Sequence, residues 1–295
     1  MDIVLIGLGR IARYHIAALL STPRYRLCGL CDIRETRVSQ AHPEFTLFTD
    51  YEQLLDRLAP AAAVIATPPS THEAIVAACL QRGVLPMVEK PLAEHEEEGR
   101  RFLSPEWQGR YVPIHHTLYG EEILWFMAHC PLQRIDAIHM ELSDPYADEH
   151  GCIDPERYGL GGCWLDSAPN ALAPLLRLLG GRKLTQVEVS HTRDAANGQP
   201  YRSRMQARAG ETEVLIEVNW QTTDNRKLTT ILADGHQYVL QHTDQAVWRN
   251  GELLFRYDAQ ERLMRQYTNF YTMYPESVPT PEEIETIYRI IYANR

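Results

Sequence analysis

The sequence predicts an α/β protein in which a doubly wound parallel sheet is followed by a second α+β domain with a large, mostly antiparallel, open-faced sheet. Two patterns predict this order. Over the first 114 residues, short apolar runs alternate with amphipathic helical segments, which is typical of parallel βαβ units. Beyond residue 115, apolar and polar residues alternate singly, which is typical of half-buried strands. We therefore expect domains at 1–114 and 115–295.

Composition limits the class of protein. A chain of 295 residues is long enough for two domains, and a formal net charge of −10 argues against nucleic acid or an anionic membrane as a partner. No apolar run is long enough to cross a membrane, and the first residues lack the basic region of a signal peptide. Six scattered cysteines favour a reducing compartment, so we expect a cytoplasmic protein. No ligand spacing indicates a metal site.

The N-terminal motif is the strongest functional signal. The apolar run Ile3–Ile6 has the length of a buried strand, and an amphipathic helix follows it. Between them, Gly7, Gly9 and Ala12 have the spacing G-x-G-x-x-A. Gly7 permits the turn out of the strand, Gly9 lets a pyrophosphate approach the backbone, and Ala12 allows the helix to pack closely on the strand. The motif and its context predict a dinucleotide site at the helix N-terminus.

A carboxylate follows at the distance that a dinucleotide fold requires. The strand Arg26–Cys31 leads into Asp32, twenty residues after Ala12, where a carboxylate accepts hydrogen bonds from the adenosine ribose. Asp32 favours NAD because it repels a 2′-phosphate, whereas Arg34 or Arg37 could bind that phosphate instead. We expect NAD or NADP as the cofactor, with NAD favoured.

The next elements continue the alternation. They are expected at 34–41 (helix), 45–48 (strand), 51–58 (helix), 61–66 (strand), 70–82 (helix), 85–88 (strand) and 111–114 (strand). Asp50 with Gln53 and Ser70 with Glu73 have the spacing of capping boxes at the start of two of these helices. Ligands of such sheets bind beyond the carboxyl ends of the strands. That rule places Gly7–Ala12, Asp32, Thr67–Pro69 and Glu89–Pro91 around one crevice.

The second domain is expected to consist of a sheet, one long helix and two C-terminal helices. The strands are expected at 134–142, 185–190, 202–207, 213–220, 227–233, 237–241 and 252–256, and the helices at 165–179, 259–272 and 281–293. Asp234-Gly235 and Asn250-Gly251 are typical hairpin turns. We find no internal repeat and no long linker.

Lys90 is the first candidate for chemistry. It follows a parallel strand beside the predicted cofactor crevice, flanked by Glu89 and fixed by Pro91. An ammonium group there could hydrogen-bond a substrate oxygen, or take a proton if its pKa were lowered to about 7–8. An ordinary surface lysine is the alternative.

Asp166 and Asn170 are the second candidates. They lie at i and i+4 near the start of the expected helix at 165–179, so they share one of its faces. Asp166 could instead only cap that helix. Polar and aromatic side chains precede Asp166, and such a mixture suits a sugar as well as it suits a loop that covers the sheet. They are Tyr146, His150, Arg157, Tyr158 and Trp164.

Together these residues resemble the glucose–fructose oxidoreductase / inositol dehydrogenase family (Gfo/Idh/MocA). The resemblance covers nearly the whole chain, and Glu-Lys-Pro at this distance from the glycine motif is its specific part. It rests on Gly7–Ala12 with Asp32, Thr67-Pro68-Pro69 with His72, Glu89-Lys90-Pro91-Leu92-Ala93, and Gly161-Gly162 followed by Asp166-x-x-x-Asn170. It implies a Rossmann domain, then an open-faced sheet that carries the substrate site and often oligomerises. It also implies NAD(P)-dependent hydride transfer at a secondary alcohol or hemiacetal of a sugar or cyclitol.

The resemblance implies roles for individual residues. Lys90 would be the active-site lysine, and Asp166 would match the family's aspartate. The cofactor would contact Gly7, Gly9, Arg10, Ile11, Ala12, Asp32, Arg37, Thr67, Pro68, His72, Glu89 and Lys90. The substrate would contact His115, His116, Tyr158 and Trp164, although two adjacent histidines after a strand are as often structural.

Asn170 departs from the family pattern, because most members carry the catalytic histidine there. A neutral amide cannot act as a base near pH 7. Either Asn170 holds the substrate oxygen while Asp166 or Lys90 handles the proton, or the chain is a catalytically silent cofactor or sugar sensor. An imine or carbonyl reductase is a third interpretation. The Asp-x-x-x-Asn pattern is similar to the aldose 1-dehydrogenase branch, whose hemiacetal substrate has an acidic hydroxyl and tolerates a weaker base.

Overall fold

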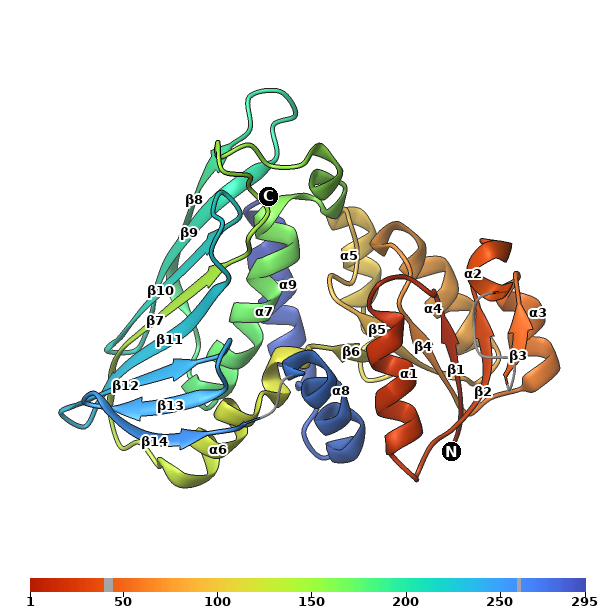
Figure 1. The fold of residues 1–295 in the computed structure, drawn as a ribbon, viewed down its shortest axis with the longest axis horizontal. Helices are drawn as coiled ribbons and strands as arrows, with labels where there is room; N and C mark the ends of the chain where they lie inside the picture. Colours follow the sequence, from red (N-terminus) through yellow and green to blue (C-terminus); the bar gives the residue numbers. More distant parts are fainter. Residues whose placement is uncertain (40–44, 259–260) are drawn as a thin grey trace. The chain divides into compact units, whose positions relative to one another are not determined.

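The computed structural model describes residues 1–39, 45–258 and 261–295 (Figure 1). Its contacts divide the chain into two units, of which the first is Met1–His116 with Leu263–Glu285 and the second is Thr117–Arg262 with Thr286–Arg295. The ends of two expected helices, at 40–41 and 259–260, lie outside the described residues. Within the described part of the chain, no helix combines the length and the apolar character that a membrane crossing needs.

The first unit contains a six-stranded parallel sheet with the order β3-β2-β1-β4-β5-β6, so the predicted doubly wound sheet is confirmed. Its strands are β1 (Asp2–Ile6), β2 (Arg26–Cys31), β3 (Thr46–Phe48), β4 (Ala62–Ile65), β5 (Leu85–Glu89) and β6 (Val112–Ile114). The strand order reverses between β1 and β4, and ligands of doubly wound sheets bind at that switch point. Apart from Asp2 at the start of β1, both strands are continuous apolar runs and are almost fully buried, as is typical of central parallel strands.

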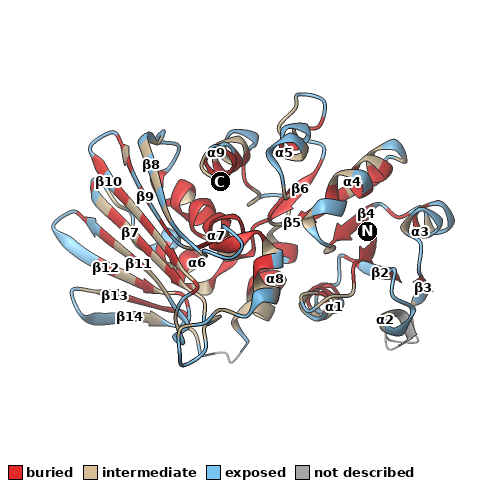
Figure 2. Ribbon diagram, turned by 90° about the horizontal axis from the view of Figure 1, so that it is seen from above, coloured by how far each residue is buried: buried red, intermediate tan, exposed pale blue. Residues whose placement is uncertain are grey.

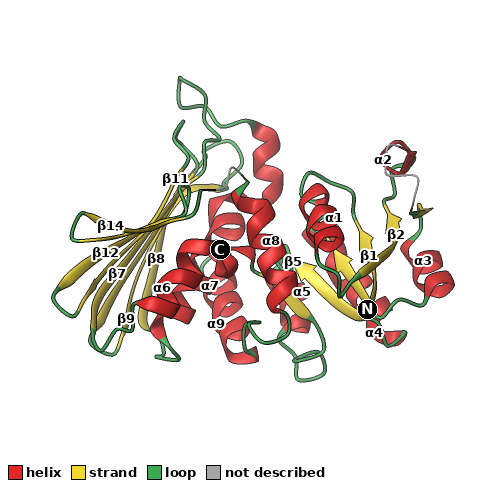
Figure 3. Cartoon of the chain, turned by 60° about the horizontal axis from the view of Figure 1, so that its bottom comes forward, coloured by secondary structure: helices red, strands yellow, loops and turns green. Residues whose placement is uncertain are grey.

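Helices accompany the strands of the first unit (Figure 3). They are α1 (Ala12–Ser21), α2 (Glu35–Ser39), α3 (Tyr51–Leu58), α4 (His72–Gln81), α5 (Glu96–Phe102) and most of α8 (Arg262–Met273). The predicted N-cap of α3 is confirmed, since Asp50 accepts hydrogen bonds from the N–H groups of Glu52 and Gln53. The Gln53 side chain donates to Asp50 Oδ2 at 3.1 Å, which is not the backbone bond of the predicted capping box. Thus α8, from the C-terminal part of the sequence, groups with the N-terminal sheet.

The predicted capping box of Ser70 and Glu73 is wrong. Pro69–Thr71 form a 3₁₀ turn, and α4 begins only at His72, with no side-chain cap. The physical reason is local, because the Thr71 hydroxyl donates to the carbonyl oxygen of Pro68 at 2.7 Å and closes the turn before the helix starts.

The second unit contains an eight-stranded sheet with the order β14-β13-β12-β11-β7-β10-β9-β8. The strands are β7 (Ile135–Ser143), β8 (Thr185–Arg193), β9 (Pro200–Ala209), β10 (Thr212–Asn219), β11 (Arg226–Ala233), β12 (His236–Gln241), β13 (Ala246–Arg249) and β14 (Glu252–Arg256). All pairings are antiparallel except that of β7 with β10. The mostly antiparallel sheet is therefore confirmed, and the short strand β13 was not predicted.

Residues alternate between buried and exposed along the strands of this sheet (Figure 2). The buried face carries apolar side chains such as Ile138, Met140, Ile216 and Ile231. Helix α7 (Gly162–Leu179) packs against β7, β9 and β10, and α6 (Glu121–His129) packs against β12, β13 and β14. The last helix, α9 (Pro281–Ala293), continues from the first unit into the second.

Helix α7 begins three residues earlier than predicted, at Gly162. Gly162 has a φ of +81°, and a Cβ there would lie 2.6 Å from the Pro200 side chain. Only glycine fits such a position, which fixes the sharp entry into the helix. The helix then runs through Pro169 and Pro174 to Leu179.

Candidate functional site

The turn after β1 is built for close approach of a ligand. Gly7 has a φ of +99°, and a Cβ at this position would lie 2.5 Å from the carbonyl oxygen of Ala66, so only glycine fits. A Cβ at Gly9, in contrast, would meet no described atom within 4 Å. The space beside Gly9 is therefore free for a ligand such as a pyrophosphate. Ala12 is buried and begins α1, whose N-terminus faces this turn.

Asp32 fixes this turn to the end of β2. Its Oδ2 accepts from the N–H of Leu8 at 2.8 Å, and its Oδ1 accepts from the N–H of Arg34 at 2.9 Å. Arg37 donates to Oδ2 at 3.1 Å. Burial raises the pKa of Asp32, but the hydrogen bonds from Arg34, Leu8 and Arg37 outweigh it and hold the pKa below its usual value. Since a carboxylate has about four acceptor positions, room remains for a ribose hydroxyl.

His72 connects the loops that follow β4 and β5. Its Nε2 lies 2.9 Å from the carbonyl oxygen of Thr67, and its Nδ1 lies 3.2 Å from that of Leu92. Burial lowers the pKa of His72, and a neutral imidazole has a single N–H to donate. His72 is almost fully buried, so it supports the loop of Thr67 and Pro68 from within.

Glu89, the last residue of β5, lies in a buried network that sequence reasoning missed. Its Oε1 accepts hydrogen bonds from the Tyr267 hydroxyl at 2.7 Å and from His15 Nε2 at 3.1 Å. His15 Nδ1 lies 2.8 Å from the Tyr271 hydroxyl. Burial raises the pKa of Glu89, but hydrogen bonding from His15 and its charge outweigh burial and lower the pKa strongly. Tyr267 and Tyr271 lie at i and i+4 on α8, so they reach this network from one face of the helix, but their spacing alone does not indicate Glu89 as the partner.

Lys90 is half-buried and directly follows this network. The next strand, β6, ends at Ile114 and leads to His115, which has no exposed surface. Burial, together with the charges of His116 and Lys90, lowers the pKa of His115 to about 3, although the charge of Glu89 acts in the opposite direction. His115 is therefore neutral at pH 7. His116 donates from Nδ1 to the Gln266 side chain at 2.9 Å, which anchors it to α8.

In the second unit, Asp166 and Asn170 lie on α7 as predicted. The N-cap of this helix is Gly161, so the alternative that Asp166 only caps the helix is wrong. Asp166 is half-buried, and the same holds for Asn170. The Oδ1 atom of Asn170 is buried and has no hydrogen-bond partner among the described residues. Leaving such an atom unsatisfied costs about 1–3 kcal/mol, which makes it a candidate contact for a ligand.

The two aromatic candidates of the second unit have packing positions. Trp164 has no exposed surface, and its indole N–H donates to the carbonyl oxygen of Ile291 at 3.2 Å. The Tyr158 hydroxyl donates to Asp194 at 3.4 Å, and burial raises the pKa of Tyr158 to about 12. In this structure a substrate therefore cannot touch Trp164, and it can reach only the small exposed part of Tyr158.

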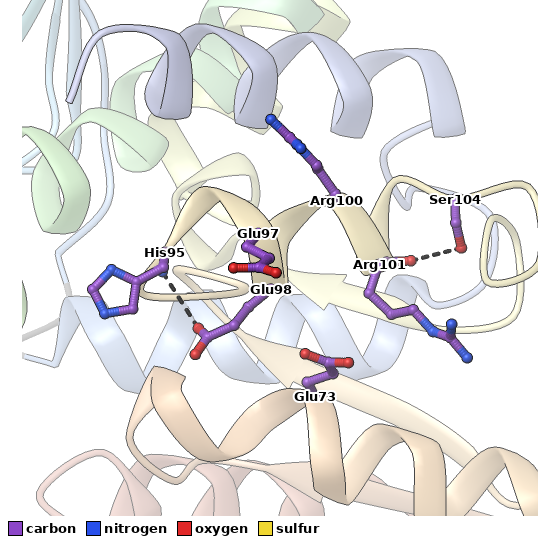
Figure 4. Close-up of a pocket in the computed structure, with 7 residues that line it drawn as sticks. All are labelled: Glu73, His95, Glu97, Glu98, Arg100, Arg101 and Ser104. Carbon is purple, nitrogen blue, oxygen red and sulfur yellow. Dashed lines mark hydrogen bonds between the residues drawn. The ribbon is translucent and has the colours of Figure 1, made fainter.

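A surface pocket of the first unit has none of the predicted site residues in its lining (Figure 4). It is lined by Glu73, His95, Glu97, Glu98, Arg100, Arg101 and Ser104. Acidic and basic side chains are mixed along its wall, so it does not select for a charge of either sign. Over residues 1–39, 45–258 and 261–295, no group of three His, Cys, Asp or Glu side chains could hold a metal ion.

Comparison with known proteins gives one family model, one relative by sequence and several solved structures. Residues 1–105 match the model of the Gfo/Idh/MocA oxidoreductase family, which is described by its NAD-binding Rossmann fold. The chain is 24% identical over 215 residues to the uncharacterized oxidoreductase YdgJ of Escherichia coli. That match covers 67% of this chain and 59% of the relative, which is less than two thirds of the relative's length.

Solved structures share the whole fold. An oxidoreductase from Agrobacterium radiobacter, in complex with NAD+, L-tartaric acid and magnesium, has a TM-score of 0.82 at 12% identity and covers 100% of this chain and 95% of its own. A myo-inositol dehydrogenase from Corynebacterium glutamicum has a TM-score of 0.80 at 14% identity. The match covers 99% of this chain and 95% of that dehydrogenase. At these identities the likeness shows the fold alone.

Proposed function

Since the chain belongs to the Gfo/Idh/MocA family of oxidoreductases, we propose that it is an NAD(P)-dependent dehydrogenase or reductase of a sugar or sugar-like substrate. One observation carries the proposal. The glycine turn at Gly7 and Gly9, the carboxylate of Asp32 and the half-buried Lys90 all follow strands of one parallel sheet, at its carboxyl edge. A cofactor and a reacting group belong at that edge.

The residues of the first unit suit a dinucleotide. The open space beside Gly9 and the N-terminus of α1 fit a pyrophosphate. The remaining acceptor positions of Asp32 fit a ribose hydroxyl, which favours NAD, while Arg37 is near enough to Asp32 to meet a 2′-phosphate of NADP. The bound nicotinamide would accept or donate the hydride. The remaining cofactor contacts that we propose are Arg10, Ile11, Thr67, Pro68 and Glu89.

The proton is the second half of the reaction. When an alcohol is oxidised, its carbon loses a hydride to the nicotinamide and its hydroxyl loses a proton. We assign this proton to the Asp166 carboxylate or to Lys90 in its neutral amine form, either of which can accept it, whereas the Asn170 amide cannot. The buried Asn170 Oδ1 would instead accept a hydrogen bond from a substrate hydroxyl and so orient the reacting carbon. A hemiacetal, which is oxidised to a lactone, fits this arrangement best because its hydroxyl is comparatively acidic.

A panel assay tests this function. Purified protein is mixed with NAD or NADP and with aldoses, sugar acids or inositols, and the reduced cofactors are mixed with ketones, aldoses and imines. The absorbance of the reduced nicotinamide is followed. We expect reduction of NAD by an aldose or a secondary alcohol. Turnover of imines alone would instead establish an imine reductase.

Asn170 also favours a second function. Because it replaces the histidine that most family members carry, a catalytically silent sensor of cofactor or sugar remains the second candidate. That function predicts dinucleotide binding of ordinary strength with no turnover on any member of the panel. Asn170→His would then be the first variant to assay for a gain of turnover.

We further propose that the chain forms a homo-oligomer through the outer face of the sheet of the second unit. This face carries exposed Leu232 and Leu253, each 42% accessible, beside the half-buried Trp248. Oppositely charged pairs lie on the same face, with Arg204 3.9 Å from Glu217. An apolar patch with mixed charges suits a second copy of the chain.

We also propose that the protein works in the cytoplasm. The free state of all six cysteines supports this compartment.

A further inference from the structure

A chain of polar contacts joins α7 to the sheet of the second unit, next to Asp166. Lys227 Nζ lies 2.7 Å from Asp144 Oδ1. The Ser167 hydroxyl donates to Asp144 Oδ2 at 2.8 Å, and the Trp220 indole N–H donates to the Ser167 oxygen at 3.0 Å. No motif of the sequence indicates a role for Asp144, Ser167, Trp220 or Lys227.

The topology of the sheet brings these residues together. Asp144 directly follows β7, and Trp220 directly follows the parallel neighbour β10. Lys227 is the second residue of β11, which runs antiparallel to β7 on its other side. Three adjacent strands therefore place these side chains at one end of the sheet. Ser167 reaches the same point from the buried side of α7, one residue after Asp166.

Lys227 and Asp144 form a largely buried ion pair. Their side chains are 13% and 17% exposed. Lys227 Nζ also donates to Asn225 Oδ1 at 2.5 Å and to the carbonyl oxygen of Ser143 at 3.4 Å, so its three N–H groups all have acceptors. A lysine bound in this way cannot donate to a substrate without losing a partner. A buried ion pair adds little net stability, because desolvation offsets the attraction. The pair instead fixes the position of the Asp144 carboxylate, which binds Ser167.

Asp166 takes part in the same electrostatic environment. Burial lowers the pKa of Lys227, whereas the charges of Asp144 and Asp166 act in the opposite direction. The positive charge of Arg262 lowers it as well. One buried ammonium group thus serves two carboxylates, of which Asp144 holds Ser167 and Asp166 precedes Ser167 on α7. Removing that ammonium group would take away a positive charge that pairs with Asp144 and acts on Asp166.

We propose that Lys227 and Asp144 are positioning residues, which act through Ser167 to fix the orientation of Asp166 on α7 and which compensate its charge. This inference rests on the proposed function, because it assigns to Asp166 a contact with the substrate. It adds a determinant at the end of the sheet, in which Lys227 lies 61 residues after Asp166 in sequence and Asp144 lies 22 residues before it. A displaced Asp166 would slow the reaction, since misplacement by about 1 Å can reduce a rate roughly 100-fold.

The test compares five single variants, one of which is Ser167→Ala, and the double variant of Ser167→Ala with Lys227→Met, on the best substrate of the panel. Lys227→Met removes the charge at similar length, Lys227→Arg keeps the charge, and Asp166→Asn marks the effect of losing the proposed site residue. Lys183→Met is the matched control, because Lys183 is an exposed lysine of the same unit. For each variant kcat, the KM of the substrate, the KM of the dinucleotide and the melting temperature are measured.

We expect Lys227→Met to lower kcat roughly 10- to 100-fold while the KM of the dinucleotide changes less than about 2-fold. Lys227→Arg should recover a substantial part of kcat, and Lys183→Met should behave as wild type. If Lys227 had a merely structural role, Lys227→Met would lower the melting temperature but would not lower kcat selectively while the KM of the dinucleotide stays unchanged. In Ser167→Ala combined with Lys227→Met, the losses should be smaller than the product of the single losses, because both act through Asp144.

Three results would overturn the inference, and the first two are distinguishable from failure of the proposed function. If Asp166→Asn lowers kcat strongly but Lys227→Met leaves it within about 2-fold of wild type, the positioning role is wrong and the proposed function stands. If the losses of kcat in Ser167→Ala and Lys227→Met multiply in the double variant, the two residues act independently and the proposed connection through Asp144 is wrong. If Asp166→Asn leaves kcat unchanged, the role proposed for Asp166 fails, and the positioning inference fails with it.

Discussion

The hydroxyl of Tyr267 donates a 2.7 Å hydrogen bond to Glu89 Oε1. Through this bond α8, which comes late in the sequence, holds the end of β5, directly before Lys90. His15, from the helix that follows the glycine turn, binds the same carboxylate oxygen. The predicted cofactor helix and the predicted active-site lysine are thus connected through a single buried carboxylate.

The first prediction concerns Tyr267→Phe. This change removes a hydrogen bond to a charged, buried acceptor and keeps the ring, so we expect it to lower the free energy of unfolding by about 1.5–3 kcal/mol. Denaturant unfolding at pH 7 measures the change. Tyr257→Phe, on a half-buried tyrosine outside this network, is the control. A loss below about 0.5 kcal/mol for Tyr267→Phe would show that the bond does not support the fold.

The second prediction is a pH dependence of stability. The pKa of Glu89 is lowered in the folded state from an ordinary value of 4.5, so its ionised form stabilises the fold. This stabilisation is fully present above pH 4.5 and is lost as the pH falls through the lowered folded pKa. The difference in the free energy of unfolding between wild type and Glu89→Gln should therefore shrink below that pH. The exposed Glu97→Gln is the control, and an equal difference at all pH values would contradict the assignment.

The third prediction contrasts the two glycines of the N-terminal turn. Gly7→Ala would place a Cβ 2.5 Å from a backbone oxygen at a positive φ, so we expect a lower melting temperature. Gly9→Ala would meet no described atom of the protein, so it should fold normally. It should nevertheless weaken dinucleotide binding about tenfold or more, because the methyl group occupies the space left for the pyrophosphate. Titration with NADH by fluorescence measures this, and unchanged affinity in Gly9→Ala would place the cofactor elsewhere.

The fourth prediction concerns cofactor choice. Asp32→Ser should lower the affinity for NAD roughly tenfold, since an ionic hydrogen bond to the ribose is lost. It should also raise the relative affinity for NADP, because repulsion of the 2′-phosphate disappears and Arg37 loses its carboxylate partner. The ratio of the two dissociation constants measures the effect. An unchanged ratio would show that Asp32 does not face the ribose.

The fifth prediction concerns the outer face of the second sheet. Leu232→Glu and Leu253→Glu place charges on two exposed leucines of this face. We expect the combined variant to have the mass of a single 33.8 kDa chain in light scattering, while wild type has a multiple of it. The control is Leu20→Glu, an exposed leucine on α1. A wild-type protein that is already a monomer would contradict the proposed interface.

The local sequence pattern was sufficient to predict the parallel sheet and the positions of the loops that follow its strands. The parallel sheet follows from features that are close together in sequence, and each feature determines the local structure at its own position. They are the apolar run Ile3–Ile6, the spacing of Gly7, Gly9 and Ala12, and the position of Asp32. The cap at Asp50 followed in the same way. The cap at Ser70 did not, because the hydroxyl of Thr71 closes a 3₁₀ turn that competes with it.

Contacts between distant parts of the chain could not be predicted. The bonds of Glu89 to Tyr267 and of Lys227 to Asp144 depend on which helices and strands become neighbours in the fold. The residue types at these positions do not indicate those neighbours. Trp164 illustrates the opposite error. Its place beside Asp166 in sequence suggested a substrate contact, but on α7 it points into the core and donates to Ile291.

The most direct measurement compares turnover and dinucleotide binding in Lys90→Met. The account predicts that kcat falls about 10²- to 10⁴-fold, which is the usual contribution of a group that moves a proton or holds the reacting oxygen, while the Kd of NADH stays within about 3-fold of wild type. Lys183→Met should retain both. Unchanged kcat in Lys90→Met, with wild-type turnover established on the same substrate, would contradict the placement of the active site at the end of β5.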